Sequence, residues 1–164
     1  MNDIQQKIEE IYGNKLRIRV GGICVKNDQV LLVKHVNLGK DNILWAPPGG
    51  GIIFGESAHV ALQREFLEET GLTIVTEKLL FVNEYIQPPL HAVELFFLVK
   101  ETGGNLKIGT DPEMQMEHQI IQETAYLSFA EIKLGNPDCY HSLFAKVNTI
   151  EELKALRGYF LNGK

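Results

Sequence analysis

The sequence has only two cysteines and no long apolar run. Cys24 and Cys139 lie far apart and outside any spacing typical of a zinc site, so neither a disulfide framework nor a zinc centre is expected. No segment approaches a membrane-spanning length, and residues 1–13 lack the apolar core of a signal peptide. We therefore expect a cytoplasmic protein that makes no contact with a membrane.

Positive charge is scarce as well. The chain carries 16 lysines and arginines against 21 aspartates and glutamates, a formal net charge of -5. This balance gives no electrostatic reason to expect nucleic acid binding, and a polyphosphate ligand would need a counter-cation. A chain of 164 residues that is 45% hydrophobic fits one globular domain. We expect a single domain over residues 1–164, and the pattern leaves open whether it forms a homodimer.

Apolar periodicity and turn residues predict a mixture of helices and strands. A short amphipathic helix over residues 3–12 is expected to open the chain and to end at Gly13. The Asn27-Asp28 pair is typical of a turn and predicts a hairpin between two segments rich in β-forming residues. Strands are expected over residues 17–26, 29–35, 43–46, 79–86, 92–100 and 124–127.

The second half of the chain contains a long polar segment and two helix-start signals. Residues 103–122 are polar and irregular, and a long loop in a compact domain is often functional. Capping boxes begin at Ser128 and Thr149. They predict a short helix near Phe129 and a terminal helix over residues 150–160.

A third helix is predicted over residues 58–70, which contain neither proline nor glycine. Ser57 can cap its start, and Gly71 suits the position just past its end. Leu62 with Phe66, and Val60 with Leu67, are expected to bury the helix. The pattern thus predicts that the packing residues and an acidic edge occupy different faces of the helix.

The acidic edge consists of three glutamates on this helix. Glu65, Glu68 and Glu69 stand at positions i, i+3 and i+4, which brings their carboxylates together. Like charges at this spacing destabilise a helix by about 0.2 to 0.5 kcal/mol per pair, unless a bound divalent cation offsets them. Arg64 lies four residues before Glu68 and can orient or partly neutralise a carboxylate. By itself, such a cluster is more typical of a solvated acidic face than of a metal site.

The wider context argues against a merely solvated face. The stretch from Gly50 to Leu72 satisfies the pattern G-x5-E-x7-R-E-U-x-E-E-x-G-U, in which U is apolar. At background residue frequencies of about 5 to 7%, a chance match in this chain has a probability on the order of 10⁻⁶. The matching residues are Gly50, Glu56, Arg64, Glu65, Phe66, Glu68, Glu69, Gly71 and Leu72.

This stretch is similar to the Nudix box at every specified position. The resemblance implies an α/β fold, an α/β/α sandwich with a mixed sheet in which the box forms a loop-helix-loop. It also implies a hydrolase that cleaves the diphosphate linkage of a nucleoside diphosphate joined to another moiety. Its cofactor would be Mg²⁺, with Mn²⁺ as a substitute, because carboxylates and substrate phosphates together suit such cations.

The resemblance also implies roles for individual residues. Glu68 and Glu69 would be the principal metal ligands, and Glu65 a further ligand or the base that activates water. Gly50 would offer its backbone carbonyl to the metal or shape the loop. Arg64 would belong to the catalytic group.

Three other glutamates have supporting or open roles. Glu56 would brace the box through an ion pair with Arg64, which is a stability role as much as a functional one. Some members of the family take a ligand or base from a later loop. Glu113 and Glu117 lie in such a loop here, and each is either a candidate for that role or a solvated charge.

Several alternatives remain open for the substrate and the activity. A proline about sixteen residues past the box is associated in this family with ADP-ribose-type substrates, and Pro88 stands there, although Pro88-Pro89 is equally typical of a rigid turn. A nucleoside triphosphate, a dinucleoside polyphosphate or a nucleotide sugar would also fit the box. A Nudix-like domain that senses a nucleotide without cleaving it, or a metal-dependent isomerase, would be a different class of function.

Outside the box, the sequence offers weaker candidates. Arg17, Arg19 and Lys34 lie on predicted strands, where a positive side chain could meet phosphate or simply face solvent. Trp45 could stack on a base or pack beside the glycine run. Neither pattern decides between its two interpretations.

Overall fold

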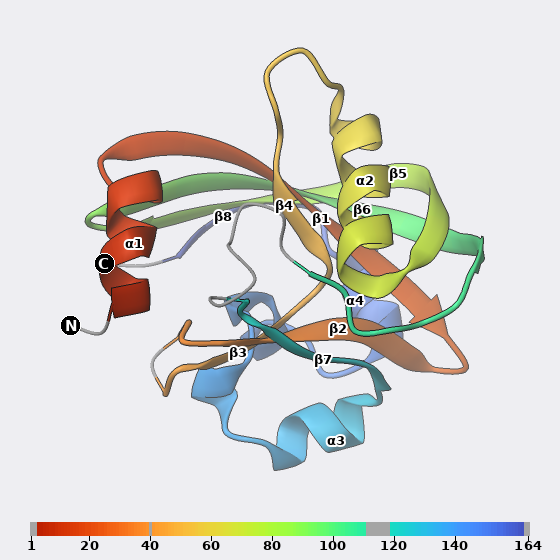
Figure 1. Cartoon of the computed structure of the whole chain (residues 1–164). Coiled ribbons are helices and arrows are strands. Elements are labelled where there is room, and N and C mark those ends of the chain that lie inside the picture. Colours follow the sequence, from red (N-terminus) through yellow and green to blue (C-terminus); the bar gives the residue numbers. More distant parts are fainter. Residues whose placement is uncertain (1–2, 40, 111–118, 163–164) are drawn as a thin grey trace.

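The computed structural model describes residues 3–39, 41–110 and 119–162, which form a mixed α/β fold with a large sheet (Figure 1). Glu113 and Glu117 lie outside the described residues. The strand order is β3-β2-β1-β6-β5-β8, with β4 paired to β1 and β7 paired to β2. The elements are α1 (Asp3–Tyr12), β1 (Lys15–Lys26), β2 (Gln29–Val36), β3 (Ile43–Ala46), β4 (Gly49–Gly51), α2 (Ala58–Thr70), β5 (Leu72–Gln87), β6 (Leu90–Gly104), β7 (Ile121–Leu127), α3 (Phe129–Leu134), η2 (Pro137–Cys139), η3 (Ser142–Ala145), α4 (Ile150–Ala155) and β8 (Gly158–Asn162).

The first hairpin forms at the predicted turn but separates almost at once. Asn27 and Asp28 both have positive φ values, as a tight hairpin turn requires. Strands β1 and β2 pair only at Val25↔Val30 and Lys26↔Gln29. Beyond these pairs, β1 runs parallel to β6 and antiparallel to β4, whereas β2 pairs with β3 and β7. Beyond the turn the sheet therefore divides into two parts, one that contains β1, β4 and β6 and one that contains β2, β3 and β7.

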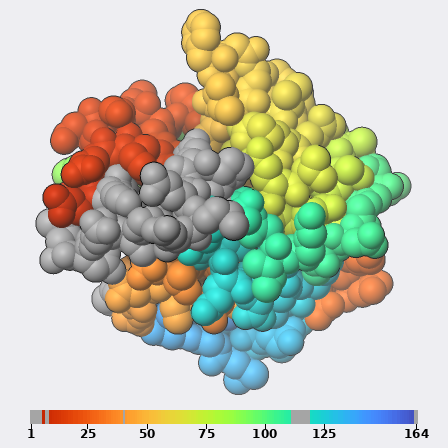
Figure 2. All heavy atoms as spheres, viewed as in Figure 1, coloured from red at the N-terminus to blue at the C-terminus, as the bar shows by residue number. Residues whose placement is uncertain are grey.

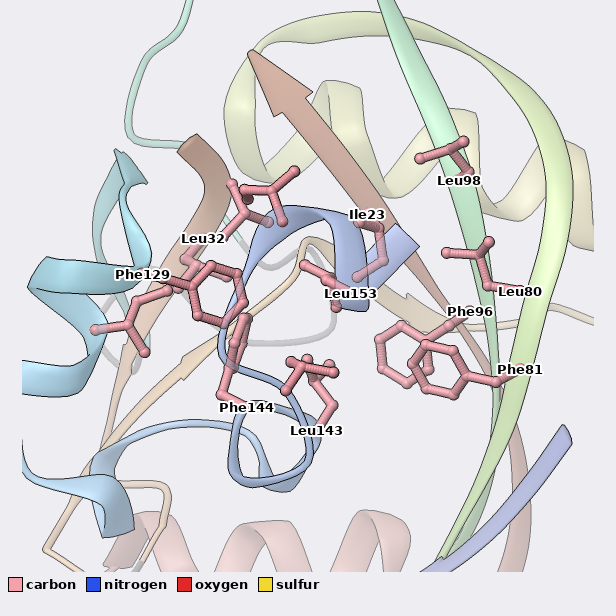
Figure 3. Close-up of a cluster of buried hydrophobic side chains, with 14 residues drawn as sticks. Ile23, Leu32, Leu80, Phe81, Phe96, Leu98, Phe129, Leu143, Phe144 and Leu153 are labelled. Carbon is pink, nitrogen blue, oxygen red and sulfur yellow. The ribbon is translucent and has the colours of Figure 1, made fainter. Parts of the chain in front are cut away.

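Alternating side chains of the central strands fill two separate cores. On β6, Phe96 and Leu98 belong to a core formed with α3, η3 and α4, in which Phe81 stacks on Phe96 at 4.8 Å between ring centroids (Figure 3). Phe97 and Val99, on the opposite face, pack in a second core beneath α2. Helices thus cover both faces of the sheet, which is the layered α/β/α arrangement that the sequence predicted.

Helix α2 begins and ends where the capping residues predicted. The Ser57 side chain accepts a hydrogen bond from the backbone of Val60, and Gly71 adopts the left-handed conformation with φ of 73°. The expected separation of packing and acidic faces is wrong, because Glu65 and Glu69 are buried together with the apolar core face. Val60 and Leu67, which were expected to pack, are about half exposed, at 51% and 53%.

Two other expectations need correction. The terminal helix ends at Ala155 rather than at residue 160, and the chain continues as β8, which pairs in parallel with β5. Gly158 has a φ of 93°, a conformation outside the helical region that glycine adopts readily. The glycine run Gly49–Gly51, for which no strand was predicted, forms β4 against β1. None of the described helices is long and apolar enough to span a membrane.

Candidate active site

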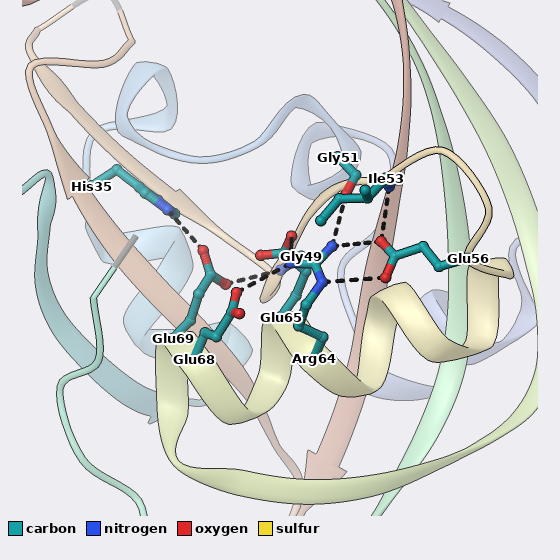
Figure 4. A network of polar contacts seen from close by, with 9 residues as sticks. All are labelled: His35, Gly49, Gly51, Ile53, Glu56, Arg64, Glu65, Glu68 and Glu69. Atoms are coloured by element: carbon teal, nitrogen blue, oxygen red, sulfur yellow. Dashed lines mark hydrogen bonds and ion pairs between the residues drawn. The ribbon is translucent and has the colours of Figure 1, made fainter. Parts of the chain in front are cut away.

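A cavity of about 530 Å³ contains the acidic edge of α2. Its wall includes four of the residues expected to catalyse the reaction, together with the expected backbone ligand. Glu56 is not part of the wall. It lies in the loop before α2, next to Arg64 (Figure 4). The wall residues from the box are Gly50, Arg64, Glu65, Glu68 and Glu69.

Arg64 is the centre of the polar network at this wall (Figure 4). Its guanidinium donates to Glu56 through Nη2 at 2.7 Å and Nε at 3.3 Å, so the expected ion pair is present. Nη1 donates to Glu65 at 2.7 Å and to Glu68 at 3.1 Å, and Nη2 also reaches the carbonyl of Gly51 at 3.0 Å. One side chain therefore ties the loop, the strand β4 and two helix carboxylates together.

Glu65 is buried against the glycine strand. A Cβ added to Gly50 would lie 2.4 Å from the carboxylate carbon of Glu65, so the missing side chain provides the space for this carboxylate. Burial raises the pKa of Glu65 to about 7, and the charge of Glu69 adds to this effect while Arg64 opposes it. The site therefore disfavours a third negative charge in the absence of a cation.

Substitution of Gly50 tests the space that this glycine provides. We expect Gly50→Ala to displace the Glu65 carboxylate and to lower hydrolytic activity by about 10- to 100-fold, the usual cost of disturbing a ligand's surroundings. The melting temperature should change little, because the clash is with the end of a flexible side chain. Gly103→Ala, whose added Cβ would meet only the Thr73 hydroxyl at 3.1 Å, is the control. Equal activity in the two variants would contradict the assigned role of Gly50.

Glu69 and Glu68 complete the acidic edge. The backbone N–H of Gly49 donates to Glu69 Oε2 at 2.9 Å, and His35 Nε2 lies 3.6 Å from Oε1. Within the described residues, the hydrogen-bond partner of the Glu68 side chain is Arg64, and this side chain is 27% exposed. Glu68 is thus the carboxylate most open to the cavity. His35 was not singled out from the sequence, because it lies on β2, far from the box.

The end of α2 is held by the segment that follows β6. The backbone N–H groups of Lys107, Gly109 and Thr110 donate to the carbonyls of Thr70, Glu69 and Glu68. A Cβ on Gly109 would lie 1.9 Å from the Glu68 carbonyl oxygen, so only glycine permits this approach. These bonds satisfy helix-end carbonyls and fix the turn that carries two of the three glutamates.

The donor chemistry of this wall fits a divalent cation. Three carboxylates and a backbone carbonyl are the oxygen ligands that Mg²⁺ and Mn²⁺ prefer, and burial, followed by the charge of Glu69, raises the pKa of Glu65. Within residues 3–39, 41–110 and 119–162, no three acidic, histidine or cysteine side chains converge as metal ligands, and Arg64 and the Gly49 backbone hold two of the carboxylates. The cavity wall therefore fits a divalent cation in the type of its donor atoms and in its negative charge.

A second polar cluster lies in the same cavity, outside the box. Glu94 on β6 accepts hydrogen bonds from Asn83 Nδ2 at 2.8 Å and His141 Nε2 at 3.0 Å, and pairs with Arg19 at 3.5 Å. The backbone N–H of Leu143 donates to His141 Nδ1, which presents Nε2 to Glu94. Burial opposes ionisation of Glu94, but contact with His141, Arg19 and Asn83 outweighs it and lowers its pKa to about 2.

This lowered pKa predicts a loss of stability in acid. Since the unfolded chain binds a proton to Glu94 near pH 4.5 and the folded chain only near pH 2, folding stability should fall as pH drops through this window. The contribution is at most about 3 kcal/mol. Urea denaturation of wild type and Glu94→Gln from pH 6 downwards measures it. The difference between the two proteins should shrink below about pH 4.5; a constant difference would contradict the assignment.

The cavity also decides between interpretations that the sequence left open. Arg17 and Arg19 line it, whereas Lys34 does not and lies 3.9 Å from Glu123. Trp45 packs against the apolar core, so the packing interpretation holds. Pro88 lies in the turn between β5 and β6 and is not among the residues of the cavity wall.

Some cavity residues could not be identified from the sequence. Glu94, His141 and Tyr85 come from separate segments and match no motif. Among the cavity residues outside the box, the sequence pointed to Arg17 and Arg19. They stand two residues apart on a strand, which places both side chains on one face of the sheet.

Comparison with known proteins indicates the same family as the motif. The NUDIX domain model matches residues 15–145. An ADP-ribose pyrophosphatase of Methanocaldococcus jannaschii is 35% identical over 96 residues, which cover 57% of this chain and 56% of that protein. An 8-oxo-dGTP diphosphatase of Proteus vulgaris is 33% identical over 92 residues, 56% of this chain and 82% of that protein.

A solved structure extends the likeness to the fold. A Nudix hydrolase from Nitrosomonas europaea superposes with a TM-score of 0.67 at 23% identity, over 80% of this chain and 85% of that chain. Nudix hydrolases generally need a divalent metal, in agreement with the donor chemistry of the cavity. The domain model spans most of the chain, and the glutamates and the arginine of the predicted catalytic group line one cavity. This chain belongs to the Nudix family.

Proposed function

We propose that this protein hydrolyses the diphosphate linkage of a nucleoside diphosphate joined to another moiety. The observation that carries the proposal is the shared cavity, which combines the three glutamates of α2 with Arg17 and Arg19 on the neighbouring strand β1. A diphosphate needs both parts, because a cation at the carboxylates and arginines beyond it can together offset its charge.

Mg²⁺, with Mn²⁺ as a substitute, is the proposed cofactor. Glu68 and Glu69 would hold it, with the Gly50 carbonyl and Glu65 as further donors. When bound, such a cation polarises phosphoryl oxygens and lowers the pKa of a coordinated water. The burial of Glu65 and Glu69 and the openness of Glu68 to the cavity support this donor set.

The remaining roles belong to side chains of the box itself. Glu65 would be either a further ligand or the base that takes the proton of the attacking water, and Arg64 would keep its carboxylate in place through the 2.7 Å hydrogen bond. Glu56 would hold Arg64 in turn, and it also accepts the Ile53 backbone N–H at 2.8 Å. These contacts would orient the carboxylates before substrate binds. A preorganised site lowers the activation free energy of the reaction.

Two substrate classes have support. The relative from M. jannaschii is named an ADP-ribose pyrophosphatase, and the relative from P. vulgaris an 8-oxo-dGTP diphosphatase. The chain matches only 56% of the length of the first. We favour a nucleoside diphosphate with a second moiety, because the cavity continues past the glutamates to Tyr85, His91 and Glu94. A nucleoside triphosphate is the second candidate.

A substrate panel tests this proposal. The purified protein is incubated with ADP-ribose, nucleotide sugars, dinucleoside polyphosphates and nucleoside triphosphates, including 8-oxo-dGTP, with Mg²⁺ or with EDTA, and the products are separated by chromatography. We expect Mg²⁺-dependent cleavage of an internal diphosphate into two monophosphates. Release of pyrophosphate from a triphosphate would favour the second candidate. If a nucleotide raises the melting temperature but none is cleaved, the protein is a nucleotide sensor rather than a hydrolase.

A further inference from the structure

A row of polar side chains crosses three strands of the sheet inside the cavity. Arg19 on β1 lies opposite Glu94 in the parallel register of β1 and β6, and Glu94 lies opposite Asn83 in the antiparallel register of β6 and β5. His141, just before η3, contacts the row from outside the sheet. The box contributes none of these four residues.

The two carboxylate oxygens of Glu94 have different partners. Oε2 accepts from both Asn83 and His141, at 2.8 and 3.0 Å. Oε1 faces Arg19 Nε at 3.5 Å, which is longer than a normal hydrogen bond. His141 also packs edge-on against the Phe96 ring, with centroids 5.3 Å apart. Glu94 is thus held by Asn83 and His141 at one oxygen, and its other oxygen attracts Arg19 by charge.

Arg19 is the member of this row that reaches into the cavity. Its side chain is 30% exposed, whereas Glu94 and His141 are 15% and 12% exposed. Arg19 is also the β1 partner of Gly51 in the β1–β4 register, and Gly51 follows the glycine that contacts Glu65. Neighbouring strands lie about 4.8 Å apart. The next residue of β1 packs in the core beneath α2, so alternation along the strand places Arg19 on the opposite face of the sheet.

The other arginines of the cavity are already engaged in strong contacts. Arg64 donates to three carboxylates and a carbonyl, and the Arg17 guanidinium stacks on the Tyr12 ring at 3.7 Å from its centroid. The contact that the described residues provide for Arg19 is the 3.5 Å ion pair with Glu94. A planar guanidinium held at its Nε edge can present its Nη groups to phosphate oxygens in the two-pronged geometry that arginine favours.

We propose that Arg19 binds the second phosphate of the diphosphate, the one away from the α2 carboxylates, and that Glu94 is a positioning residue that orients Arg19. This proposal rests on the proposed function, because it assumes that the first phosphate lies at the glutamates. It defines the ligand class as a diphosphate held at both phosphates. The competing explanation is structural: the row would only attach the segment before η3 to the sheet.

Binding of a non-hydrolysable diphosphate distinguishes the two explanations. Calorimetry in the presence of Mg²⁺ measures the affinity for methylenediphosphonate and for orthophosphate in wild type, Arg19→Gln, Arg19→Lys and Arg157→Gln. Arg157 is a matched control, because it is exposed and, within the part of the chain that the structure describes, its hydrogen bonds are with the carbonyls of Lys154 and Leu156. We expect Arg19→Gln to weaken methylenediphosphonate binding by about 10- to 100-fold without changing orthophosphate binding, with Arg19→Lys intermediate and Arg157→Gln unchanged.

Equal affinities in wild type and Arg19→Gln, or no binding of methylenediphosphonate by wild type, would overturn the proposal. The outcome is separate from that of the substrate panel. If substrates are cleaved but Arg19→Gln binds the diphosphonate normally, only the assignment of Arg19 fails. If the diphosphonate depends on Arg19 but nothing is cleaved, the phosphate site stands and the hydrolase assignment fails.

A double-mutant cycle tests the role of Glu94. A residue that acts through Arg19 affects the ligand only while Arg19 is present. Glu94→Gln should therefore change methylenediphosphonate affinity in the wild-type background and leave it unchanged in the Arg19→Gln background. A purely structural role would lower the melting temperature in both backgrounds and shift the affinity equally in both, and that result would overturn the positioning role.

Discussion

Replacement of Glu69 by glutamine should lower hydrolytic activity on the order of 10³-fold and leave the fold intact. The amide keeps one oxygen, which can still accept the Gly49 backbone N–H that Glu69 accepts at 2.9 Å. The other oxygen becomes an amide NH₂ group, which carries no charge and does not coordinate a cation. Because the variant also removes one of three adjacent negative charges, the metal-free protein should melt within a few degrees of wild type or slightly above it.

The measurement compares activity in saturating Mg²⁺ with melting in EDTA. Glu77→Gln is the matched control, since Glu77 is an exposed glutamate on β5, outside the cavity. The control should retain full activity. A Glu69→Gln variant that melts normally and keeps activity within a few-fold of wild type would remove Glu69 from the metal-binding group.

Replacement of Arg64 by glutamine should have the largest effect on stability. Arg64 is about three-quarters buried and donates to Glu56, Glu65, Glu68 and the Gly51 carbonyl. Its loss leaves three carboxylates without their counter-charge, and the expected decrease in the free energy of unfolding is about 2 to 4 kcal/mol. Activity should fall as well, because the loop before α2 loses its attachment to the helix.

Urea denaturation of a double-mutant cycle with Glu56→Gln measures the specific part of this effect. Arg64 lowers the pKa of Glu56 by hydrogen bonding, so the two residues form a coupled pair. The double variant should be less destabilised than the sum of the two single variants, with a coupling of about 1 to 3 kcal/mol. Additive effects would mean that the 2.7 Å contact adds nothing beyond packing.

The elements around the box were predictable because their signals are local. Ser57, Gly71 and the absence of helix breakers between them define α2, and the i, i+3, i+4 spacing brings Glu65, Glu68 and Glu69 together. The Asn27-Asp28 turn and the capping box at Ser128 act over a few residues in the same way. Each of these features depends on neighbours along the chain, so one sequence contains the necessary information.

The faces of α2 were not predictable by the same reasoning. Glu65 and Glu69 lie on the buried face because β4 consists of glycines, and the Gly50 position has no side chain to exclude a carboxylate. Helical periodicity correctly predicted that Leu62 and Phe66 are buried, but it also assigned buried positions to two apolar residues that are half exposed, Val60 and Leu67. Whether a charged or an apolar residue is buried depends here on the strand opposite the helix, which periodicity does not contain.

The part of the cavity that contains Arg19, Glu94 and His141 forms through pairing between strands that are far apart in the sequence. Arg19 and Glu94 meet only because β1 and β6 run in parallel, and His141 arrives from a segment after α3. Similarly, residues 158–162 form a strand rather than a helical end because the edge of β5 is available to pair with them. Pairing over such separations leaves no local pattern, which is why a motif can indicate the reaction while the residues that select the substrate stay hidden.

The most direct test of the central claim is a titration with Mn²⁺ followed by electron paramagnetic resonance, which detects the free ion. Wild type and Glu77→Gln should bind Mn²⁺ equally, and Glu68→Gln and Glu69→Gln should each bind it at least about tenfold more weakly. Equal Mn²⁺ binding in all four proteins would contradict the claim that the α2 glutamates hold the catalytic cation.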